Sequence, residues 1–144
     1  MISINPYFNF AGNTEDAFRF YRSVFGGDFS RLQRFKDTPE GPRVADNERN
    51  MLMHVSLPVG KVNTLMATDA LASIDQKVVM GNNIHLVIDT ESKEEANTLF
   101  NGLAAGGTVN VPMADTFWGS YFGMLKDRYG IHWMVSYTPK SKPT

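Results

Sequence analysis

The chain has 144 residues, of which 42% are hydrophobic and 20% charged, so it is long enough for one domain with a buried core. Its formal net charge of -1 argues against a nucleic-acid partner, because nucleic-acid-binding domains are usually strongly basic. The lack of cysteine excludes disulfides, thiolate catalysis and cysteine-ligated zinc sites.

The first residues, MISINPYFNF, predict a strand rather than a targeting segment. They lack the basic flank and long apolar run of a signal peptide, and no window of eighteen consecutive apolar residues occurs anywhere. We therefore expect a cytoplasmic protein with no membrane partner. Residues 2–10 alternate, with Phe8 and Phe10 on one face and Tyr7 and Asn9 on the other.

The next stretch predicts a helix over residues 14–25. Asn13 is a suitable N-cap, and Asp16 lies in the first turn, where the helix dipole favours negative charge. Apolar residues then recur at helical spacing, and the pair Gly26-Gly27 ends the helix.

Three further strands are expected in this half, over residues 29–35, 51–57 and 62–68. Residues 37–50 are polar and contain two prolines and a glycine, so they predict an exposed loop. A loop of this length is often a lid or a binding loop, and a plain surface excursion is an equally good interpretation. Residues 69–81 then connect to the second half, with a short helical turn.

The second half repeats this pattern. A strand over 83–89 precedes a helix over 92–105, which begins with the capping-box spacing of Ser92 and Glu95. A strand over 108–113 and a hairpin over 116–137 follow. In the hairpin, Gly130 can supply the positive φ that the turn requires.

The two halves therefore predict an internal duplication within a single domain, 1–144. The modules are expected over about 1–70 and 80–138, each in the order βαβββ. The predicted fold is α+β, with paired βαβββ modules forming curved mixed sheets and the helices on the convex faces. Polar residues alternate with the apolar ones in both first strands, so we expect a cavity on the concave side.

Nearly the whole chain resembles the PhnB-like branch of the glyoxalase/bleomycin-resistance/extradiol-dioxygenase superfamily, also called vicinal oxygen chelate proteins. The matching segments are NPYFNFAGNTEDAFRFYRSVFGG, MHVSL, LMATDA, GNNIHLVIDTESKEEANTLF and GGTVNVPMADTFWGSYFGMLKDRYGIHWMV. This resemblance implies paired βαβββ modules, a cavity in each curved sheet, homodimers and, in the enzymes, a divalent metal. Some members carry a 3-demethylubiquinone methyltransferase label, but this chain has no glycine-rich nucleotide-binding motif to support it.

The resemblance also places four metal-ligand positions, where the enzymes usually carry His and Glu. Here these positions fall near Asn5, Met66, Asn83 and Met134. Amides and thioethers are poor ligands for hard divalent metals. We therefore expect no bound catalytic metal and no cofactor.

Three histidines, His54, His85 and His132, fall in predicted strands on concave faces. Histidine is the usual general base near neutral pH, so these are the catalytic candidates, although each alone could be a hydrogen-bonded wall residue. The sequence pattern places Leu52 on the face of His54. The ligand-binding candidates are Tyr7, Asn9, Met66, Asp69, Phe117, Trp118 and Met134.

Other polar residues allow two interpretations each. Asp69 could orient a histidine or a ligand, or it could cap the segment that follows it. Arg34 and Arg43 could pair with an anionic ligand or lie at the surface.

The predicted function is a small-molecule binding protein that holds a partly apolar organic ligand in a sheet-lined cavity. The alternative is an enzyme of altered, metal-independent mechanism, of lyase or isomerase type, with a cavity histidine as general base. A homodimer is expected in either case.

Overall fold

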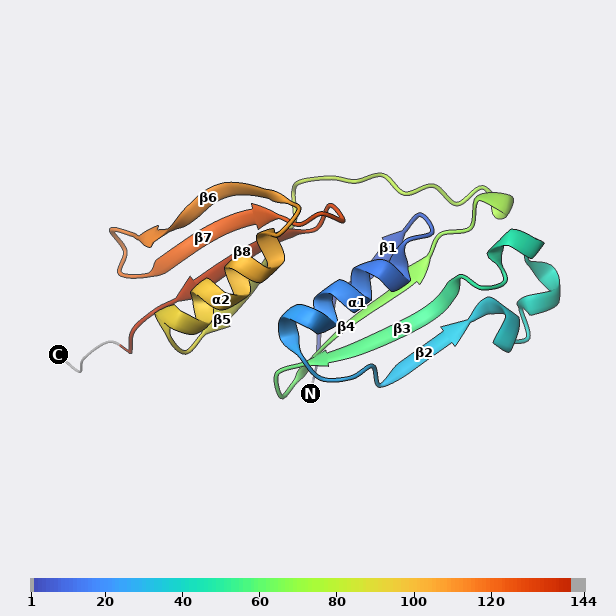
Figure 1. Ribbon diagram of the computed structural model, residues 1–144, viewed down its shortest axis with the longest axis horizontal. Coiled ribbons are helices and arrows are strands. Elements are labelled where there is room, and N and C mark those ends of the chain that lie inside the picture. The colour runs from blue at the N-terminus through green and yellow to red at the C-terminus, as the bar shows by residue number, and fades with distance from the viewer. Residues whose placement is uncertain (1, 141–144) are drawn as a thin grey trace. The chain divides into compact units, whose positions relative to one another are not determined.

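The computed structural model describes residues 2–140 and confirms the predicted α+β fold (Figure 1). The chain divides into two compact units, residues 1–79 and 80–144, and each contains one helix and one four-stranded sheet. Of the helices within residues 2–140, none is long and apolar enough to cross a membrane.

The first unit follows the order strand, helix and three strands. Its elements are β1 (Tyr7–Phe10), α1 (Thr14–Phe25), β2 (Arg31–Arg34), β3 (Leu52–Val59) and β4 (Asn63–Asp69). The sheet order is β1-β4-β3-β2, with β1 parallel to β4 and the other neighbours antiparallel. Three 3-10 turns lie between β2 and β3, namely η1 (Phe35–Asp37), η2 (Gly41–Arg43) and η3 (Asp46–Glu48), and the last two fall within the loop predicted over residues 37–50. A fourth, η4 (Ala72–Ile74), follows β4.

The second unit has the same connectivity, as the predicted duplication requires. Its elements are β5 (Leu86–Thr90), α2 (Lys93–Ala104), β6 (Thr108–Asp115), β7 (Tyr121–Lys126) and β8 (His132–Tyr137). The sheet order is β5-β8-β7-β6, with β5 parallel to β8.

The strand β1 begins later than the sequence pattern predicts. It starts at Tyr7 rather than near residue 2. Pro6 has no backbone N–H for a ladder, and the Asn5 side chain, through Oδ1, accepts the Thr64 N–H at 3.0 Å. A side chain therefore takes the place of a strand pair at this end of the sheet.

Aromatic rings hold α1 against the first sheet. Phe10, Phe18 and Tyr21 are almost completely buried. The Phe8 ring lies 6.2 Å from that of Phe18, and the rings of Phe18 and Tyr21 are 5.5 Å apart in an edge-on arrangement. The prediction that Phe8 and Phe10 lie on the helix-facing side of β1 is therefore confirmed.

Helix α2 packs closely on the second sheet where β7 carries a glycine, Gly123. A Cβ added at Gly123 on β7 would lie 2.8 Å from the Phe100 ring of α2 and 2.6 Å from the Met113 sulfur. Side chains on the helix side therefore fill the space beside Gly123.

The hairpin between β7 and β8 is organised by one buried carboxylate. Asp127 Oδ1 accepts the backbone N–H groups of Tyr129 and Ile131 at 2.8 and 3.1 Å. Its Oδ2 accepts the indole N–H of Trp133 at 2.8 Å. Gly130 has φ +93°, so the predicted glycine-dependent turn is confirmed.

A second buried carboxylate caps α1. Asp69, at the end of β4, accepts the Thr14 N–H at 3.0 Å with Oδ1 and the Leu52 N–H at 2.8 Å with Oδ2. Asn13 occupies the N-cap position, but its side chain makes no capping hydrogen bond, so the predicted local cap is wrong. A carboxylate at a helix N-terminus also interacts favourably with the helix dipole, which a neutral amide cannot match.

The cap of α2 is local, as predicted. Ser92 Oγ accepts the Glu95 N–H at 3.0 Å, and the Glu95 carboxylate accepts the Glu91 N–H at 3.0 Å. The two units therefore share a topology but stabilise their helix starts differently.

We predict that Asp69→Asn lowers the free energy of unfolding by about 2–4 kcal/mol, because the amide removes the charge and presents a donor to one of two buried N–H groups. Urea denaturation measures the change. The matched control is Asp89→Asn, an exposed carboxylate on β5, which should change stability by less than about 0.5 kcal/mol. Equal effects at the two positions would contradict a capping role for Asp69.

Candidate functional site

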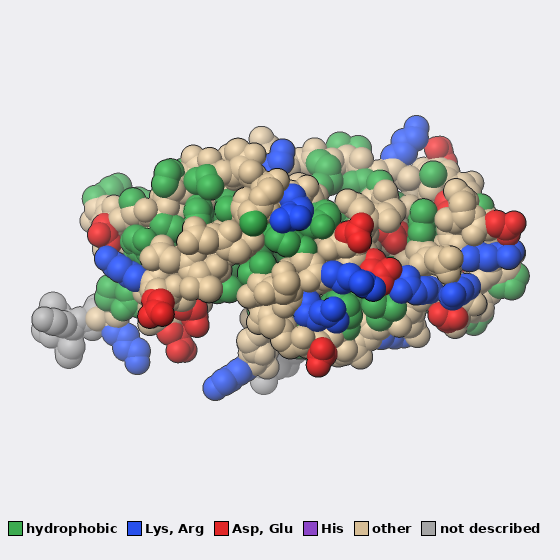
Figure 2. Space-filling view, viewed as in Figure 1, with side chains coloured by type: hydrophobic (Ala, Val, Ile, Leu, Met, Phe, Trp, Pro, Cys, Tyr) green, Lys and Arg blue, Asp and Glu red, His purple; other side chains and the backbone are tan. Residues whose placement is uncertain are grey.

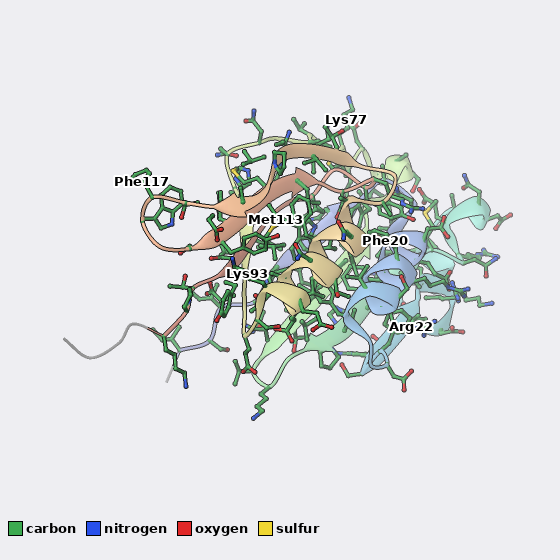
Figure 3. The ribbon with its side chains drawn as sticks, turned by 60° about the vertical axis from the view of Figure 1, so that its left-hand side comes forward. Phe20, Arg22, Lys77, Lys93, Met113 and Phe117 are labelled. Atoms are coloured by element: carbon green, nitrogen blue, oxygen red, sulfur yellow. The ribbon has the colours of Figure 1, made fainter. Side chains whose placement is uncertain are left out.

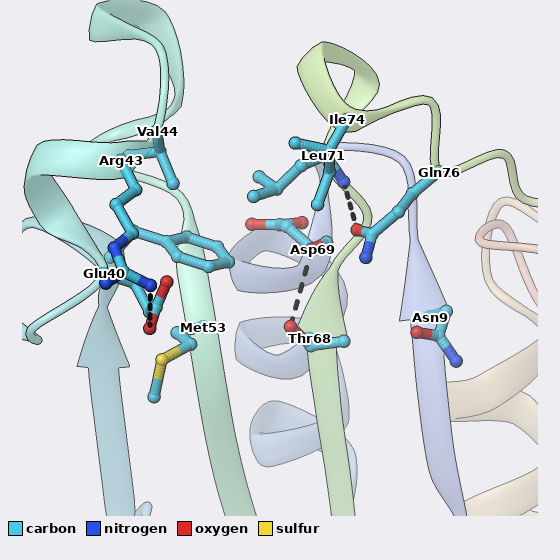
Figure 4. Close-up of a pocket in the computed structure, with 11 residues that line it drawn as sticks. Asn9, Glu40, Arg43, Val44, Met53, Thr68, Asp69, Leu71, Ile74 and Gln76 are labelled. Atoms are coloured by element: carbon cyan, nitrogen blue, oxygen red, sulfur yellow. Dashed lines mark hydrogen bonds and ion pairs between the residues drawn. The ribbon is translucent and has the colours of Figure 1, made fainter.

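A cavity of about 410 Å³ opens in the first unit (Figure 4). Its floor comes from Asn9, Met53 and Thr68, whose strands also carry the buried Phe10 and Ala67 under α1. The remaining lining residues are Phe35, Glu40, Arg43, Val44, Asp69, Leu71, Ile74 and Gln76. Of the predicted ligand-binding residues, Asn9 and Asp69 line this cavity.

The two walls are largely apolar and come from irregular segments. One wall contains Phe35 and Val44, from the stretch between β2 and β3. The opposite wall contains Leu71 and Ile74, from the stretch after β4. Phe35 and Leu71 are buried, so a ligand would meet packed apolar surface rather than mobile side chains.

The polar groups of the cavity differ in whether they can still form hydrogen bonds with a ligand. Gln76 Oε1 accepts the Leu71 N–H at 2.8 Å, and the Thr68 hydroxyl lies 3.4 Å from the Leu52 carbonyl oxygen. The Asn9 amide is exposed and has no hydrogen-bond partner among residues 2–140. Asn9 is therefore the polar floor group that is free to contact a ligand.

Asp69 lines the cavity, but its carboxylate is not free to bind a ligand or to transfer a proton. Both of its oxygens accept backbone N–H groups, and the residue is 3% exposed. Neither predicted interpretation describes this geometry, because Asp69 caps the helix and strand that precede it rather than orienting a histidine or capping the segment after it.

A loose ion pair stands at the mouth of the cavity. Arg43 Nη1 and Glu40 Oε1 are 4.0 Å apart, and both side chains are well exposed (Figure 4). The pair belongs to the loop predicted over residues 37–50, so this loop supplies one wall of the cavity. An exposed pair at this separation contributes little to stability, which leaves both charges free to turn toward a ligand.

The two walls are tied together by Glu48, a residue that the sequence pattern did not single out. Its buried carboxylate accepts the Ser73 N–H at 3.1 Å and also the Ser73 hydroxyl, which joins η3 to η4. These hydrogen bonds from Ser73 lower the pKa of Glu48 below its ordinary value, against the opposing effect of burial. No sequence signal marks this residue, because its partner lies 25 positions away.

Arg34 anchors the start of the same loop. Its guanidinium donates two hydrogen bonds to the Glu15 carboxylate, at 2.9 and 2.8 Å, and a third to the Asn50 carbonyl at 2.9 Å. The Arg34 hydrogen bonds, with a smaller contribution from Arg19, lower the pKa of Glu15 to about 2. Arg34 thus connects α1, β2 and the end of the loop.

His54 lies beside the cavity floor rather than in it. Val55 pairs with Ala67, so extending that register by one residue places His54 opposite Thr68. Its Nε2 is 2.6 Å from the Ser56 hydroxyl, and its Nδ1 is 3.5 Å from the Tyr7 hydroxyl. Burial, with a smaller contribution from the charge of Arg31, lowers the pKa of His54 and favours the neutral imidazole.

One residue near His54 does not follow the predicted alternation. The register shifts between Gln33 and Arg34, which pair with His54 and Leu52 and leave Met53 as a bulge. Met53 reaches the cavity floor, while Leu52 is 1% exposed. The prediction that Leu52 shares the open face with His54 is therefore wrong. Met66 pairs with Tyr7 in the adjacent register and lies on the His54 side of the sheet.

The other two histidines come together in the second unit. The ring centroids of His85 and His132 are 5.2 Å apart. Trp133 and Val135 are buried beneath α2, so alternation turns His132 and Met134 to the opposite face of the sheet.

The predicted aromatic residues lie at the tip of the hairpin between β6 and β7. Phe117 is 98% exposed and Trp118 is 57% exposed, and their rings are 5.0 Å apart. Figure 3 shows Phe117 at the turn, pointing away from the sheet. Neither residue lines the cavity of the first unit.

The residues at the four family metal positions do not fit a hard divalent ion. Asn5 is already engaged by the Thr64 N–H. Within residues 2–140, no group of three or more histidine, aspartate or glutamate side chains is arranged to hold a metal. The donor set lacks the carboxylates that such an ion prefers.

Comparison with known proteins gives consistent matches over the whole chain. A sequence model of the family described as 3-demethylubiquinone-9 3-methyltransferase matches residues 2–136. Protein YjdN of Escherichia coli K12 is 28% identical over 148 residues, 98% of either chain. Protein PA1353 of Pseudomonas aeruginosa is 37% identical, with a TM-score of 0.85 over 96% of this chain and 98% of that chain.

More distant solved structures share the fold. One from Bacillus cereus, described as a putative 3-demethylubiquinone-9 3-methyltransferase, PhnB protein, is 22% identical, with a TM-score of 0.76 over 95% of this chain and 100% of that chain. Several others are described as glyoxalase/bleomycin resistance/dioxygenase proteins, at 20% identity or less.

We predict that Glu15→Gln destabilises the protein in a pH-dependent way. The lowered pKa means that the Glu15 charge stabilises the folded state above about pH 4.5, and that this contribution disappears as the pH falls toward 2. With partial exposure reducing the effect, we expect a loss of about 1–2 kcal/mol at pH 7 and only about a quarter of that at pH 2.5.

Chemical denaturation across this pH range measures the effect. Glu94→Gln is the control, because Glu94 also lies in the first turn of a helix but is in no ion pair with an arginine among residues 2–140. A destabilisation by Glu15→Gln that does not change with pH would show that the pairing with Arg34 is not its source.

Proposed function

Because this chain belongs to the PhnB-like family described as 3-demethylubiquinone-9 3-methyltransferase, within the glyoxalase/bleomycin resistance/dioxygenase superfamily, we propose that it binds a small, partly apolar organic molecule. The observation that carries this proposal is the cavity of the first unit. Its volume of about 410 Å³ lies within the range of small-molecule sites.

The lining supports a ligand with an apolar body and few polar groups. Phe35, Met53 and Leu71 offer an aromatic ring, a thioether and an aliphatic chain, which suit an uncharged organic body. The Asn9 amide offers one donor and one acceptor on the floor. Arg43 and Glu40 are placed to meet a polar or charged end at the mouth.

The cavity predicts a specific pattern of ligand binding. A thermal-shift screen of small organic molecules should yield compounds that raise the unfolding temperature, because a ligand that binds only the folded state stabilises it. For such a compound, Asn9→Ala should weaken binding about tenfold, through loss of one or two hydrogen bonds. Val44→Trp should weaken binding strongly, because the indole occupies part of the cavity.

Asn101→Ala is the matched control, because Asn101 is exposed on α2 in the other unit. Compounds that bind Val44→Trp as tightly as the unaltered protein would place the ligand elsewhere and refute this site. A screen in which no compound stabilises the protein would count against the binding function itself.

The geometry of His54 favours a second candidate, an enzyme that uses a histidine base without a metal. A neutral imidazole in contact with the Ser56 and Tyr7 hydroxyls can accept a proton from a bound molecule. We expect a screened ligand to be converted to a product detectable by mass spectrometry if this candidate is correct. His54→Gln should then lower kcat much more than it changes KM.

His85→Gln and His132→Gln test the remaining catalytic candidates in the same assay. Turnover that none of the three substitutions lowers would remove histidine catalysis as an explanation. Ligand binding without any turnover would leave small-molecule binding as the only proposed function.

We also propose that the protein forms a homodimer. The supporting observation is exposed apolar surface in the second unit (Figure 2), with Val109 and Val111 on the edge strand β6 and Phe117 and Trp118 at the tip of the hairpin that follows it. Sedimentation velocity measures the assembly, and a monomer at high concentration would rule it out.

A further inference from the structure

Two imidazoles stand side by side on the second sheet. Leu86 pairs with Trp133 across the parallel strands β5 and β8, so His85 and His132 lie at the next level of the register. Both rings are half-buried, and neither makes a hydrogen bond within residues 2–140. Half-buried imidazoles without partners are available to bind a ligand on this face.

The separation of the two rings suits two ligands of one metal ion. An ion bound at a normal distance from an imidazole nitrogen lies roughly 3.1 Å from the ring centroid. With one nitrogen of each ring turned toward a shared ion, centroids 5.2 Å apart would subtend an angle of roughly 110° there, which is close to tetrahedral. The rings are tilted by 58°, so they are not stacked against each other.

Thioethers complete this cluster. Met134 follows His132 by two residues on β8, so both side chains lie on the same face of the strand, about 7 Å apart at their Cα atoms. Met124 of β7 is the register partner of Met134. Methionine has a flexible side chain that can bring its sulfur to an ion at this distance.

The donor set selects the metal. Imidazole and thioether groups together suit copper, and thioethers favour its monovalent state, whereas hard divalent ions prefer oxygen ligands. Lys126 is paired with His132 in the register, and the nearest acidic residue of β5, Asp89, lies four positions from His85. A monovalent ion is repelled by Lys126 half as strongly as a divalent ion.

We propose that His85, His132 and Met134, with Met124 as a neighbouring donor, form a binding site for copper(I) on the face of the second sheet that is turned away from α2. This site is independent of the cavity in the first unit, so it stands or falls separately from the proposed ligand binding. It also gives Met134 a role as a thioether ligand of a soft metal ion. Met134 lies near a position where the metal-dependent enzymes usually carry His or Glu, and a thioether cannot replace those ligands for a hard ion.

The test uses the full-length protein and copper(I) alone. Anaerobic titration against the chromophoric competitor bicinchoninate, with ascorbate as reductant, should reveal one copper(I) ion per chain. His85→Ala and His132→Ala should each weaken binding by at least about tenfold. Met134→Leu, which conserves volume, should weaken copper(I) binding but not the weaker binding of nickel(II) by the two imidazoles.

Met66→Leu and His54→Gln are the matched controls in the first unit, and both should bind copper(I) like the unaltered protein. Circular dichroism verifies that each variant is folded. Elemental analysis after dialysis should find zinc, nickel and iron far below one ion per chain.

Two results would overturn the proposal. The first is copper(I) binding that neither histidine substitution weakens, or no binding in competition with bicinchoninate. The second is near-stoichiometric zinc, nickel or iron that survives dialysis and is lost in the histidine variants, since the two imidazoles would then serve a harder metal.

Discussion

The carboxylate of Asp69 is the interaction on which the first unit depends. It stands at the end of β4 and accepts N–H groups from the start of α1 and the start of β3, so a single side chain fixes one helix and two strands. Since the cavity floor is formed by residues of these same strands, the shape of the cavity depends on a group that is itself unavailable to a ligand. A buried charge of this kind is costly to leave unpaired, and both of its oxygens are engaged.

The two units share a topology but differ in the connection that builds a site. In the first unit, a long segment with three 3-10 turns separates β2 from β3, and it forms a cavity wall that Glu48 ties to the segment after β4. In the second unit, the matching connection between β6 and β7 is a short turn that presents Phe117 and Trp118 to solvent. The duplicated fold is therefore a common frame, and the connections determine what each copy can do.

The sheet faces turned away from the helices carry mostly uncharged side chains, namely imidazoles, hydroxyls and thioethers. In the first unit, hydroxyl groups surround a histidine whose lowered pKa favours the neutral form, beside a cavity with apolar walls. In the second unit, imidazoles and thioethers share a face of the sheet. Both faces depart from the His and Glu ligand set of the metal-dependent enzymes in the superfamily, and this departure follows from the residue types alone.

The sequence by itself determined the α+β fold, the duplicated order of elements and the face on which each histidine lies. These features follow from local periodicity, glycine stops and alternation, which are properties of neighbouring residues. Tertiary structure decided which residues form the cavity, because Asp69, Glu48 and Arg34 act on partners far away in the chain. It also decided where alternation fails, since the bulge at Met53 depends on the pairing of β2 with β3, and a pattern within one strand cannot show how its neighbour is paired.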